Sequence, residues 1–386
     1  MKFKNIIIGY GASGLFLAKH LSSSDTLVIE KNSLPGVKLK ITGNGYSNFA
    51  NLKEKNNFLS YISNNKFFFS AISTYTPKDI VDFFKGQGLA INYRENDRIF
   101  TQNGSSELID ILKNNKCSVL YNTVVTDIKN NKVITTNGVY TARNIIIATG
   151  GMSYKNTGCD GFIYDFAKKN NLKTIPSYSV EGRLIYKQTS TLSGTSFSNV
   201  TITYGKKQES GTFLFTHTGF SGSACLKICE HLKQNSTLYI NFLPNCSEKD
   251  FLHQLNTYKK EGELKTFLTS FFTKSFSEYL INILNLKTNI KIKHLNDKIN
   301  KELLKVVFNK EYCNVNPIDI DKATITGGGL SLKEINPKTF NLKNLNNIYV
   351  IGESLDIHGQ IGGYNLSLAF IEAYNVYNEI KNQTNV

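Results

Sequence analysis

The sequence predicts an α/β protein whose parallel sheet, flanked by helices, is interrupted by an inserted domain of strands and helices. Residues 3–30 follow the order strand, glycine-rich turn, helix, strand. Apolar segments of the kind found in buried strands, each ending in glycine or in an acid, return at 143–151 and 346–353. Between these two segments the pattern changes, first to short alternating strands and then to apolar residues at helical spacing. Together these observations predict a discontinuous main domain.

The change of pattern sets the domain boundaries. We expect the main domain to comprise residues 1–191 and 322–386, and the insertion to comprise residues 192–321. Within the insertion, alternating residues and turns predict a β part at 192–245. A capping-box-like start, followed by apolar residues three and four positions apart, predicts a helical part at 246–321.

The first turn has the pattern Gly-x-Gly-x-x-Gly, at Gly9, Gly11 and Gly14. In such a turn the first glycine permits a sharp bend, the second lets the backbone approach a pyrophosphate, and the third lets the helix pack closely on the strand. The helix that begins near Ala12 directs its first amide groups and the positive end of its dipole at that pyrophosphate. Glu30 closes the second strand, where a carboxylate accepts hydrogen bonds from a ribose and repels a 2′-phosphate. The segment therefore predicts a dinucleotide site for FAD or NAD rather than for NADP.

The composition excludes several other classes of protein. The 386 residues are enough for two or three domains, and no run of 18 apolar residues is present that would span a membrane. The first residues enter a strand directly, without the pattern of a signal peptide, so we expect a cytoplasmic protein with reduced thiols. Of the six cysteines only Cys225 and Cys229 lie close together, and a single pair at this spacing predicts no metal site.

The formal net charge of +15 has two interpretations. It is typical either of a nucleic-acid-binding face or of a diffusely basic, solvated surface. Lysines are spread along the whole chain without a dense block, which favours the solvated surface. Residues 247–311, with 12 Lys against 8 Asp and Glu, likewise predict a mixed solvated face. We therefore expect a small-molecule substrate rather than a nucleic acid.

Residues 31–51, rich in Gly, Asn and Lys, predict a loop, either on the surface or laid along a cofactor. Joined to the first glycine turn, this segment resembles the bacterial NAD(P)/FAD-dependent oxidoreductase family of bile-acid reductase-like or aminoacetone oxidase-like flavoproteins. The family motif is Gly-Arg-Lys-x-x-x-Ser-Gly-Gly-Gly-Arg-Cys-Asn. The chain keeps Gly36, Lys38, Gly43, Gly45 and Asn48, has Thr42 in place of the serine, and departs from the motif at Val37, Asn44, Tyr46 and Ser47. Both arginines and the cysteine of the motif are therefore absent.

A second, distant segment, 352–365, matches the family motif Gly-Glu-x-x-Asp-x-x-Gly-x-x-Gly-Gly-Tyr-Asn at every position. The resemblance implies acids beside the ribityl chain of FAD and a helix N-terminus, at Gly362 and Gly363, directed at the isoalloxazine. It also implies that residues 148–151 pack under the diphosphate and that Val125 lies beside the adenine. The fold implied is a Rossmann-like FAD-binding domain. The cofactors implied are FAD and, as a transient electron donor, NAD(P)H.

The glycine turn and the resemblance together predict the cofactor contacts. The expected residues are Gly9, Gly11, Ala12, Ser13, Gly14, Glu30, Lys31, Lys38, Thr42, Gly43, Gly45, Asn48, Val125, Ala148, Thr149, Gly150, Gly151, Gly352, Glu353, Asp356, Gly362, Gly363, Tyr364 and Asn365. The catalytic candidates are Arg98, from an Arg-x-Phe element shared with the family, His217, from a Phe-Thr-His-x-Gly-x-Ser-Gly segment, and Tyr364. His217 either faces a substrate or orients a loop, and the second interpretation is favoured.

Three functional hypotheses follow. The first is an FAD-dependent oxidoreductase that transfers a hydride between a small or medium organic substrate and flavin, with NAD(P)H as electron donor. The second, suggested by charge alone, is an RNA-associated flavoprotein in nucleic-acid modification. The third is a non-catalytic flavin-binding protein. Salt-sensitive RNA binding would favour the second, and a flavin that no reductant or substrate turns over would favour the third.

Overall fold

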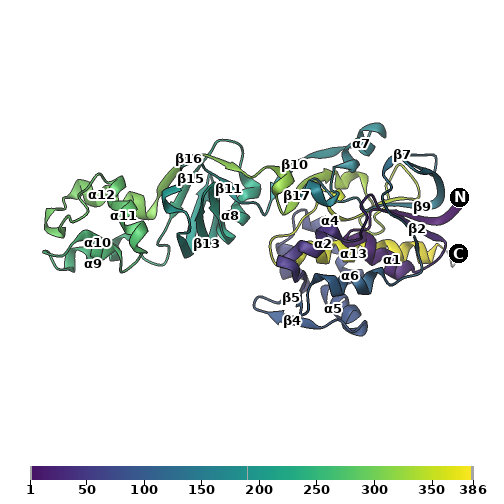
Figure 1. Cartoon of the computed structure of the whole chain (residues 1–386), viewed down its shortest axis with the longest axis horizontal. Coiled ribbons are helices and arrows are strands. Elements are labelled where there is room, and N and C mark those ends of the chain that lie inside the picture. The colour runs from purple at the N-terminus through teal and green to yellow at the C-terminus, as the bar shows by residue number, and fades with distance from the viewer. Residues whose placement is uncertain (1, 189, 384–386) are drawn as a thin grey trace. The chain divides into compact units, whose positions relative to one another are not determined.

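The computed structural model describes residues 2–188 and 190–383, and the chain divides into two compact units. The main unit contains the described residues up to Tyr178 and from Ile320 onward. The inserted unit is Ser179–Asp319. Figure 1 labels the elements of both units along the chain.

The main unit is built on a largely parallel sheet, which confirms the predicted fold class. Its strands, in spatial order, are β6 (Ser118–Leu120), β2 (Thr26–Ile29), β1 (Lys2–Ile8), β9 (Gly138–Ile147), β8 (Lys132–Thr135) and β7 (Val125–Lys129), with β18 (Ile348–Val350) also paired to β9. β6, β2, β1, β9 and β18 are parallel, whereas β7 and β8 extend the sheet as an antiparallel meander. The isoleucine-rich runs of β1 and β9 are buried at their carboxyl ends, as expected for parallel strands covered on both faces.

Helices pack against this sheet and against one another. They are α1 (Ala12–Leu21), α2 (Val37–Ile41), α3 (Lys55–Ser60), α4 (Asn65–Thr74), α5 (Pro77–Gly86), α6 (Ser105–Lys113), α7 (Phe162–Lys169) and α13 (Tyr364–Asn382). α1 and α13 lie side by side (Figure 1), and the rings of Phe16 and Phe370 stack between them at 4.7 Å. The first and last parts of the chain thus share one core.

Two smaller sheets complete the main unit. β3 (Asn48–Asn51), β5 (Arg98–Thr101) and β4 (Ile91–Arg94) form an antiparallel sheet, and β10 (Thr174–Val180) pairs with β17 (Ile325–Leu330). β3 also packs against α13. The Gly327–Gly329 run therefore belongs to a strand and not to a second nucleotide-binding turn.

The inserted unit combines a closed barrel with a group of helices. The barrel strands, in spatial order, are β11 (Leu184–Ile185), β14 (Gly219–Ser221), β13 (Lys207–Thr216), β12 (Ser196–Tyr204), β15 (Ser236–Asn241) and β16 (Lys310–Pro317). The helices are α8 (Ser223–Ile228), which packs on β13, and α9 (Glu248–Thr257), α10 (Leu264–Leu268), α11 (Lys274–Ile283) and α12 (Asp297–Phe308). One buried cluster of apolar residues, rich in phenylalanine, runs through both parts.

The boundaries of the insertion differ from those predicted. The sequence places the first boundary between 191 and 192, but β11 pairs with β14 and β16, so the inserted unit begins at Ser179. The prediction also placed a helical part at 246–321, whereas residues 310–317 of it form β16, a strand that pairs with β15. β11 has only two residues, and β16 follows a long helical segment. Neither strand has enough alternating apolar and polar residues to be predicted from its own sequence.

Within residues 2–188 and 190–383, no helix has the length and apolar character needed to cross a membrane. All six cysteines are free thiols.

Candidate functional site

Three loops meet at the carboxyl ends of neighbouring strands. Ile8 of β1 pairs with Ile147 of β9, and Ile147 pairs with Val350 of β18. The segments that follow these strands are the glycine turn 9–14, the segment 148–151 and the segment 352–353. The structure therefore brings together three groups of predicted cofactor residues that lie more than a hundred positions apart in the sequence. Ligand sites of open parallel sheets lie at such carboxyl edges.

Two glycines of the glycine turn, Gly9 and Gly14, are packed without room for a side chain. A Cβ atom on Gly14 would lie 2.0 Å from the carbonyl oxygen of Gly9, so only glycine allows α1 to approach β1 this closely. A Cβ atom on Gly352 would lie 2.7 Å from Oγ of Ser13, which shows how closely the first and third loops approach. At Thr149, Oγ1 lies 3.3 Å from Oγ of Ser354, which links the second loop to the third.

Glu30 connects the ends of β1 and β2. Its Oε2 accepts from the Tyr10 backbone N–H at 2.6 Å, and its Oε1 accepts from the backbone and side-chain nitrogens of Asn32, both at 2.8 Å. The carboxylate is nearly buried and holds the glycine turn to the neighbouring segment. Since an ionised carboxylate offers about four acceptor positions, Glu30 retains capacity for a ribose hydroxyl. The adjacent Lys31 forms an ion pair with Asp160, at 2.6 Å.

Lys38 and Glu353, predicted to lie near the phosphates and the ribityl chain, form an ion pair. Lys38 Nζ lies 2.7 and 2.9 Å from the two carboxylate oxygens of Glu353, and it also donates to Ser153 Oγ at 2.7 Å. The two side chains are 20% and 22% exposed. The lysine charge is thus neutralised by an acid 315 positions away, so the pair as a whole, rather than a free lysine, borders the site.

The loop 42–45 follows α2 directly. Thr42 Oγ1 donates to the Lys38 carbonyl at 3.0 Å, and Gly43 and Gly45 both have positive φ angles. Val125 lies in the edge strand β7 and is buried, whereas the neighbouring Val124 is 42% exposed. Neither valine belongs to the three converging loops.

The N-terminus of α13 rests on β3. Gly363 has φ +94°, and a Cβ atom there would lie 2.4 Å from the carbonyl oxygen of Ala50. In the amide orientation that satisfies both of its polar atoms, Asn48 accepts from the Gly363 N–H at 3.0 Å and donates to the Ile99 carbonyl at 3.2 Å. Asn51 donates to the Gly362 carbonyl at 2.8 Å. The glycine at 363 is therefore required by packing, and its N–H is already bound by Asn48.

The loop before α13 is held by its own polar side chains. Asn365 Oδ1 accepts from the Gly359 N–H, and its Nδ2 donates to the Gly359 carbonyl, both at 2.8 Å. Asn64 Nδ2 donates to the carbonyl oxygen of Asp356 at 2.7 Å and lies 3.3 Å from Oδ2 of that residue. Burial raises the pKa of Asp356. Asn365 and Asp356 thus shape the loop that the resemblance places beside the isoalloxazine.

The three catalytic candidates lie in two different units, His217 in the inserted unit and Arg98 and Tyr364 in the main unit. His217 is exposed in the turn between β13 and β14 of the inserted unit. Arg98 lies in β5, where its Nε donates to the Glu95 carbonyl at 2.9 Å. Tyr364 is 2% exposed and stacks on Tyr61 at 5.0 Å and 11°. The surroundings of Arg98 and Tyr364 are those of side chains that support the local structure.

A polar pair that the sequence did not indicate lies in the main unit. Tyr178 Oη is 3.1 Å from Nε2 of His358. Tyr178 is 37% exposed and lies on β10, whereas His358 is 5% exposed and lies in the loop before Gly362. Ser63 fixes this loop, since its N–H and hydroxyl both donate to the His358 carbonyl. His358 occupies an unspecified position of the family motif and Tyr178 lies in none, so only the fold reveals the pair.

A buried acid lies behind the third loop. Glu372 of α13 is 1% exposed, and its Oε2 accepts from the Gly352 N–H at 2.5 Å. Its other oxygen has no hydrogen-bond partner within the described part of the chain. Burial raises the pKa of Glu372 to about 8. This role could not be predicted from the sequence, because Glu372 lies within an apolar helix.

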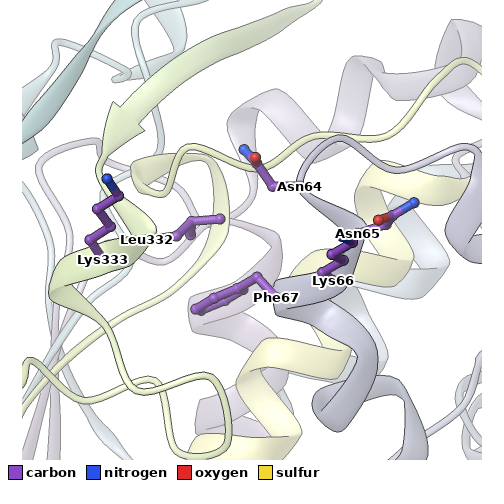
Figure 2. A pocket seen from close by; sticks show the side chains of 6 residues that line it. All are labelled: Asn64, Asn65, Lys66, Phe67, Leu332 and Lys333. Carbon is purple, nitrogen blue, oxygen red and sulfur yellow. The ribbon is translucent and has the colours of Figure 1, made fainter.

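A separate pocket of about 380 Å³ lies at the start of α4. It is lined by Asn64, Asn65, Lys66, Phe67, Leu332 and Lys333, and Figure 2 shows the apolar Phe67 and Leu332 near each other with polar side chains around them. None of these residues belongs to the three converging loops, although Asn64 also donates to the Asp356 carbonyl at 2.7 Å. No cluster of His, Cys, Asp or Glu that could hold a metal ion occurs among residues 2–188 and 190–383.

The converging loops fit a dinucleotide. α1 begins without a side-chain cap, which leaves its first amide groups available to an anion. A Cβ atom on Gly11 would meet nothing within 4 Å, so the backbone here borders open space. Three exposed apolar side chains directly precede predicted cofactor residues in the sequence, namely Ile41 at 49%, Val124 at 42% and Ile361 at 38%. An elongated ligand with a diphosphate at the glycine turn and flat rings at its ends would cover such side chains.

Comparison with known proteins gives a family and several relatives. The family model described as "HI0933-like protein Rossmann domain" matches residues 3–378. A protein of Haemophilus influenzae named ribosomal RNA dihydrouridine synthase is 29% identical over 391 residues, covering 96% of each chain. Its namesake in Escherichia coli K12 is 26% identical over 390 residues, covering 97% of this chain and 96% of that protein.

Two further matches concern steroid-type substrates. The 3-dehydro-bile acid delta(4,6)-reductase of Clostridium scindens is 24% identical over 397 residues, covering 95% of this chain and 96% of that protein. The structure of 3-ketosteroid delta1-dehydrogenase from Sterolibacterium denitrificans aligns with a TM-score of 0.54 and 11% identity, covering 99% of this chain and all of that chain. The structural match concerns the fold alone. The resemblance stated from the sequence is confirmed by the family match.

The buried acid behind Gly352 predicts a pH-dependent stability. The folded chain holds the Glu372 proton up to about pH 8, whereas the unfolded chain releases it near the ordinary pKa of 4.5. Its contribution to stability is therefore fully present below pH 4.5 and is lost as the pH rises toward 8. Glu372→Gln mimics the protonated form and should gain stability over the wild type between pH 5 and pH 8, on the order of 3 kcal/mol.

Urea unfolding of the apoprotein at pH 5 and pH 8 measures this difference. Glu379→Gln, on the same helix but in contact with Gln383 near its end, is the matched control. A stability difference between Glu372→Gln and the wild type that stays constant over this pH range would show that Glu372 does not hold a proton.

Proposed function

The chain belongs to the HI0933-like Rossmann-domain family, and from this premise we propose that it is an FAD-dependent reductase. Its proposed reaction adds a hydride and a proton across a carbon–carbon double bond conjugated to a carbonyl group. The observation that carries the proposal is the convergence of the three loops at the carboxyl ends of β1, β9 and β18. FAD, when bound, supplies the hydride chemistry, with NAD(P)H as the transient electron donor.

We expect the chain to hold FAD along this sheet edge. Gly11, Ala12 and Ser13 would direct the first amides of α1 at the diphosphate, and Glu30 would accept from the adenosine ribose. The Lys38–Glu353 pair would face the ribityl chain, where hydroxyl groups can both donate and accept. Since Gly363 N–H is bound by Asn48, the amides that remain to contact the isoalloxazine are those of other residues near the start of α13.

The class of substrate is proposed from the names of the relatives. A dihydrouridine synthase saturates the C5–C6 double bond of uridine, which is conjugated to a carbonyl, and a delta(4,6)-reductase of a 3-oxo steroid acts on double bonds conjugated to a ketone. In both reactions, one hydride and one proton are added across a double bond that is activated by a carbonyl group. The Rossmann-type fold and the predicted FAD site are compatible with either substrate.

Of these substrates we propose uridine in ribosomal RNA first. The two relatives with that activity in their names have the higher identities and cover nearly the whole chain. The net charge of +15 also favours a polyanionic substrate. This reverses the order of the hypotheses drawn from sequence, which placed a small or medium organic molecule before RNA. A steroid-like enone is the second candidate, supported by the reductase of Clostridium scindens.

The chain must supply the proton that the second carbon takes up. We propose Tyr178 for this role, because its ring is partly exposed while its hydroxyl contacts buried His358 at 3.1 Å. The imidazole can return a proton to the phenol after transfer, since either ring nitrogen can carry one. The loop that bears His358 leads directly to Gly362, so the pair lies next to the segment assigned to the isoalloxazine.

The function is tested with purified protein, NAD(P)H and ribosomal RNA transcribed without modifications. We expect digestion and mass spectrometry to show a uridine nucleoside heavier by two hydrogen atoms, formed only when FAD and NAD(P)H are both present. Parallel reactions contain a 3-oxo-delta(4,6) steroid. If the steroid is reduced and the RNA is not, the small-molecule proposal replaces the RNA proposal. If neither substrate is reduced and neither stimulates the oxidation of NAD(P)H, both proposals are contradicted.

Glu30→Ala should weaken FAD binding without altering the rate at which bound flavin is reduced. The loss of a hydrogen bond between a charged carboxylate and the ribose costs about 1.5–3 kcal/mol, or roughly 10- to 150-fold in affinity. Titration of the apoprotein with FAD measures the dissociation constant, and Glu54→Ala, at an exposed position of the same unit, is the control. An unchanged constant would remove Glu30 from the ribose site.

Tyr178→Phe keeps the ring but removes the proton, and should lower substrate turnover by roughly 100-fold or more. FAD affinity and the rate of flavin reduction by NAD(P)H should stay within about twofold, because neither needs the phenol. Tyr164→Phe, which removes a hydroxyl that donates to the Ile175 carbonyl of β10, is the matched control. Turnover by Tyr178→Phe at the level of Tyr164→Phe would exclude Tyr178 as the proton donor.

A further inference from the structure

We infer that a lysine-rich surface on the helical part of the inserted unit binds the phosphate backbone of RNA. This inference rests on the proposed RNA substrate and identifies where that RNA is held. The surface, named the lysine tip here, consists of Lys259, Lys260, Lys287, Lys291 and Lys293. All five side chains are exposed.

Backbone pairing brings these lysines together. The segment after α9 lies beside the segment before α12, because Ile292 N–H donates to the Gly262 carbonyl at 3.0 Å and Leu264 N–H donates to the Ile290 carbonyl at 2.9 Å. Lys293 N–H donates to the Lys260 carbonyl at 3.1 Å. Lysines about 30 positions apart in the sequence therefore share one surface, which explains why no dense basic block is visible in the sequence.

The tip carries more positive than negative charge. Glu261 accepts from Lys291 at 2.8 Å and from Lys293 at 2.7 Å, and Glu263 is the other acid in this segment. Within the part of the chain that the structure describes, Lys259, Lys260 and Lys287 form no ion pair. Five lysines against two glutamates give the tip a net charge of +3. Since exposed ion pairs contribute little, phosphates can replace Glu261 at small cost.

α12, in the same helical part, carries a second row of lysines. Lys298, Lys301 and Lys305 are exposed and lie three and four positions apart, which places them on one side of the helix. The opposite side buries Leu303 and Val307. At a rise of about 1.5 Å per residue the row spans roughly 10 Å. Figure 1 shows α9, α10, α11 and α12 gathered in the same part of the inserted unit.

The chemistry of this surface favours a polyanion over an apolar partner. Among the described residues of the inserted unit, the exposed large apolar side chain is Tyr239 on β15, at 37%, and residues 246–311 contain none. A protein interface or an inserted membrane helix would need such side chains. Lysines without exposed aromatic rings contact phosphates rather than bases, so the tip positions the RNA and does not read its sequence.

The test uses a charge-reversed tip in the full-length, FAD-loaded protein. Lys259→Glu, Lys260→Glu and Lys287→Glu are combined, because these lysines lack an ion pair. The control combines Lys129→Glu, Lys132→Glu and Lys168→Glu, which are exposed lysines of the main unit with the same change of charge. Fluorescence anisotropy with a ribosomal RNA fragment is measured from 50 to 200 mM salt. The Gln versions of both triple variants remove charge without reversing it.

We expect the tip variant to bind RNA at least about 10-fold more weakly, and its slope of log affinity against log salt to fall by about 2–3 for three lost phosphate contacts. The control should stay within about threefold of the wild type. The inference would be overturned if the tip variant bound RNA as tightly as the wild type, or if the tip variant and the control variant lost the same amount of RNA affinity. It would also be overturned if the wild type bound phosphatidylserine vesicles but not RNA.

Turnover separates this inference from the proposed function. If the tip variant binds and reduces ribosomal RNA like the wild type, the inference fails while the function stands. If RNA binding depends on the tip but no uridine is reduced, the inference stands and the function fails. Reduction of free uridine nucleoside should be equal in wild type and tip variant, since a nucleoside has no phosphate backbone for the lysines to hold.

Discussion

The parallel alignment of β1, β9 and β18 is the constraint on which the candidate site depends. Because the three strands run in one direction and are neighbours in the sheet, the segments that follow them open at the same edge. A Cβ atom on Gly14 would lie 2.0 Å from the Gly9 carbonyl oxygen, and one on Gly352 would lie 2.7 Å from Oγ of Ser13, so glycine at these positions allows the turn to close and the third loop to pack on the Ser13 side chain. A substitution that separated these strands would displace the predicted cofactor residues of all three loops at once.

Many residues predicted to bind the cofactor also hold the site together. Glu30 binds the amides of Tyr10 and Asn32, and Asn365 binds both polar groups of the Gly359 backbone. Asn48 and Ala50 determine that residue 363 is glycine. A match to the family motif is therefore evidence for the shape of a loop as well as for contact with a ligand, and the two effects must be measured separately.

The sequence predicted the features that are encoded locally. The turn at Gly9–Gly14, the strand before Ala148 and the start of α13 each have their own pattern of glycine and apolar residues. It did not predict features that depend on distant pairing. The ion pair of Lys38 with Glu353, the Tyr178–His358 contact and the closure of the barrel by β11 and β16 join segments whose partners leave no local trace. The lysine tip could not be predicted for the same reason. The charge counted over residues 247–311 does not show which lysines lie together in the folded chain.

The central claim is that the edge formed by these three strands binds FAD. The most direct measurement is identification of the cofactor released by heat from purified protein, or bound by apoprotein after reconstitution. We expect a yellow protein that releases FAD, because the glycine turn and Glu30 fit an adenosine diphosphate half and the loop before α13 fits a flavin. Release of FMN alone, or failure to take up FAD on reconstitution, would contradict it.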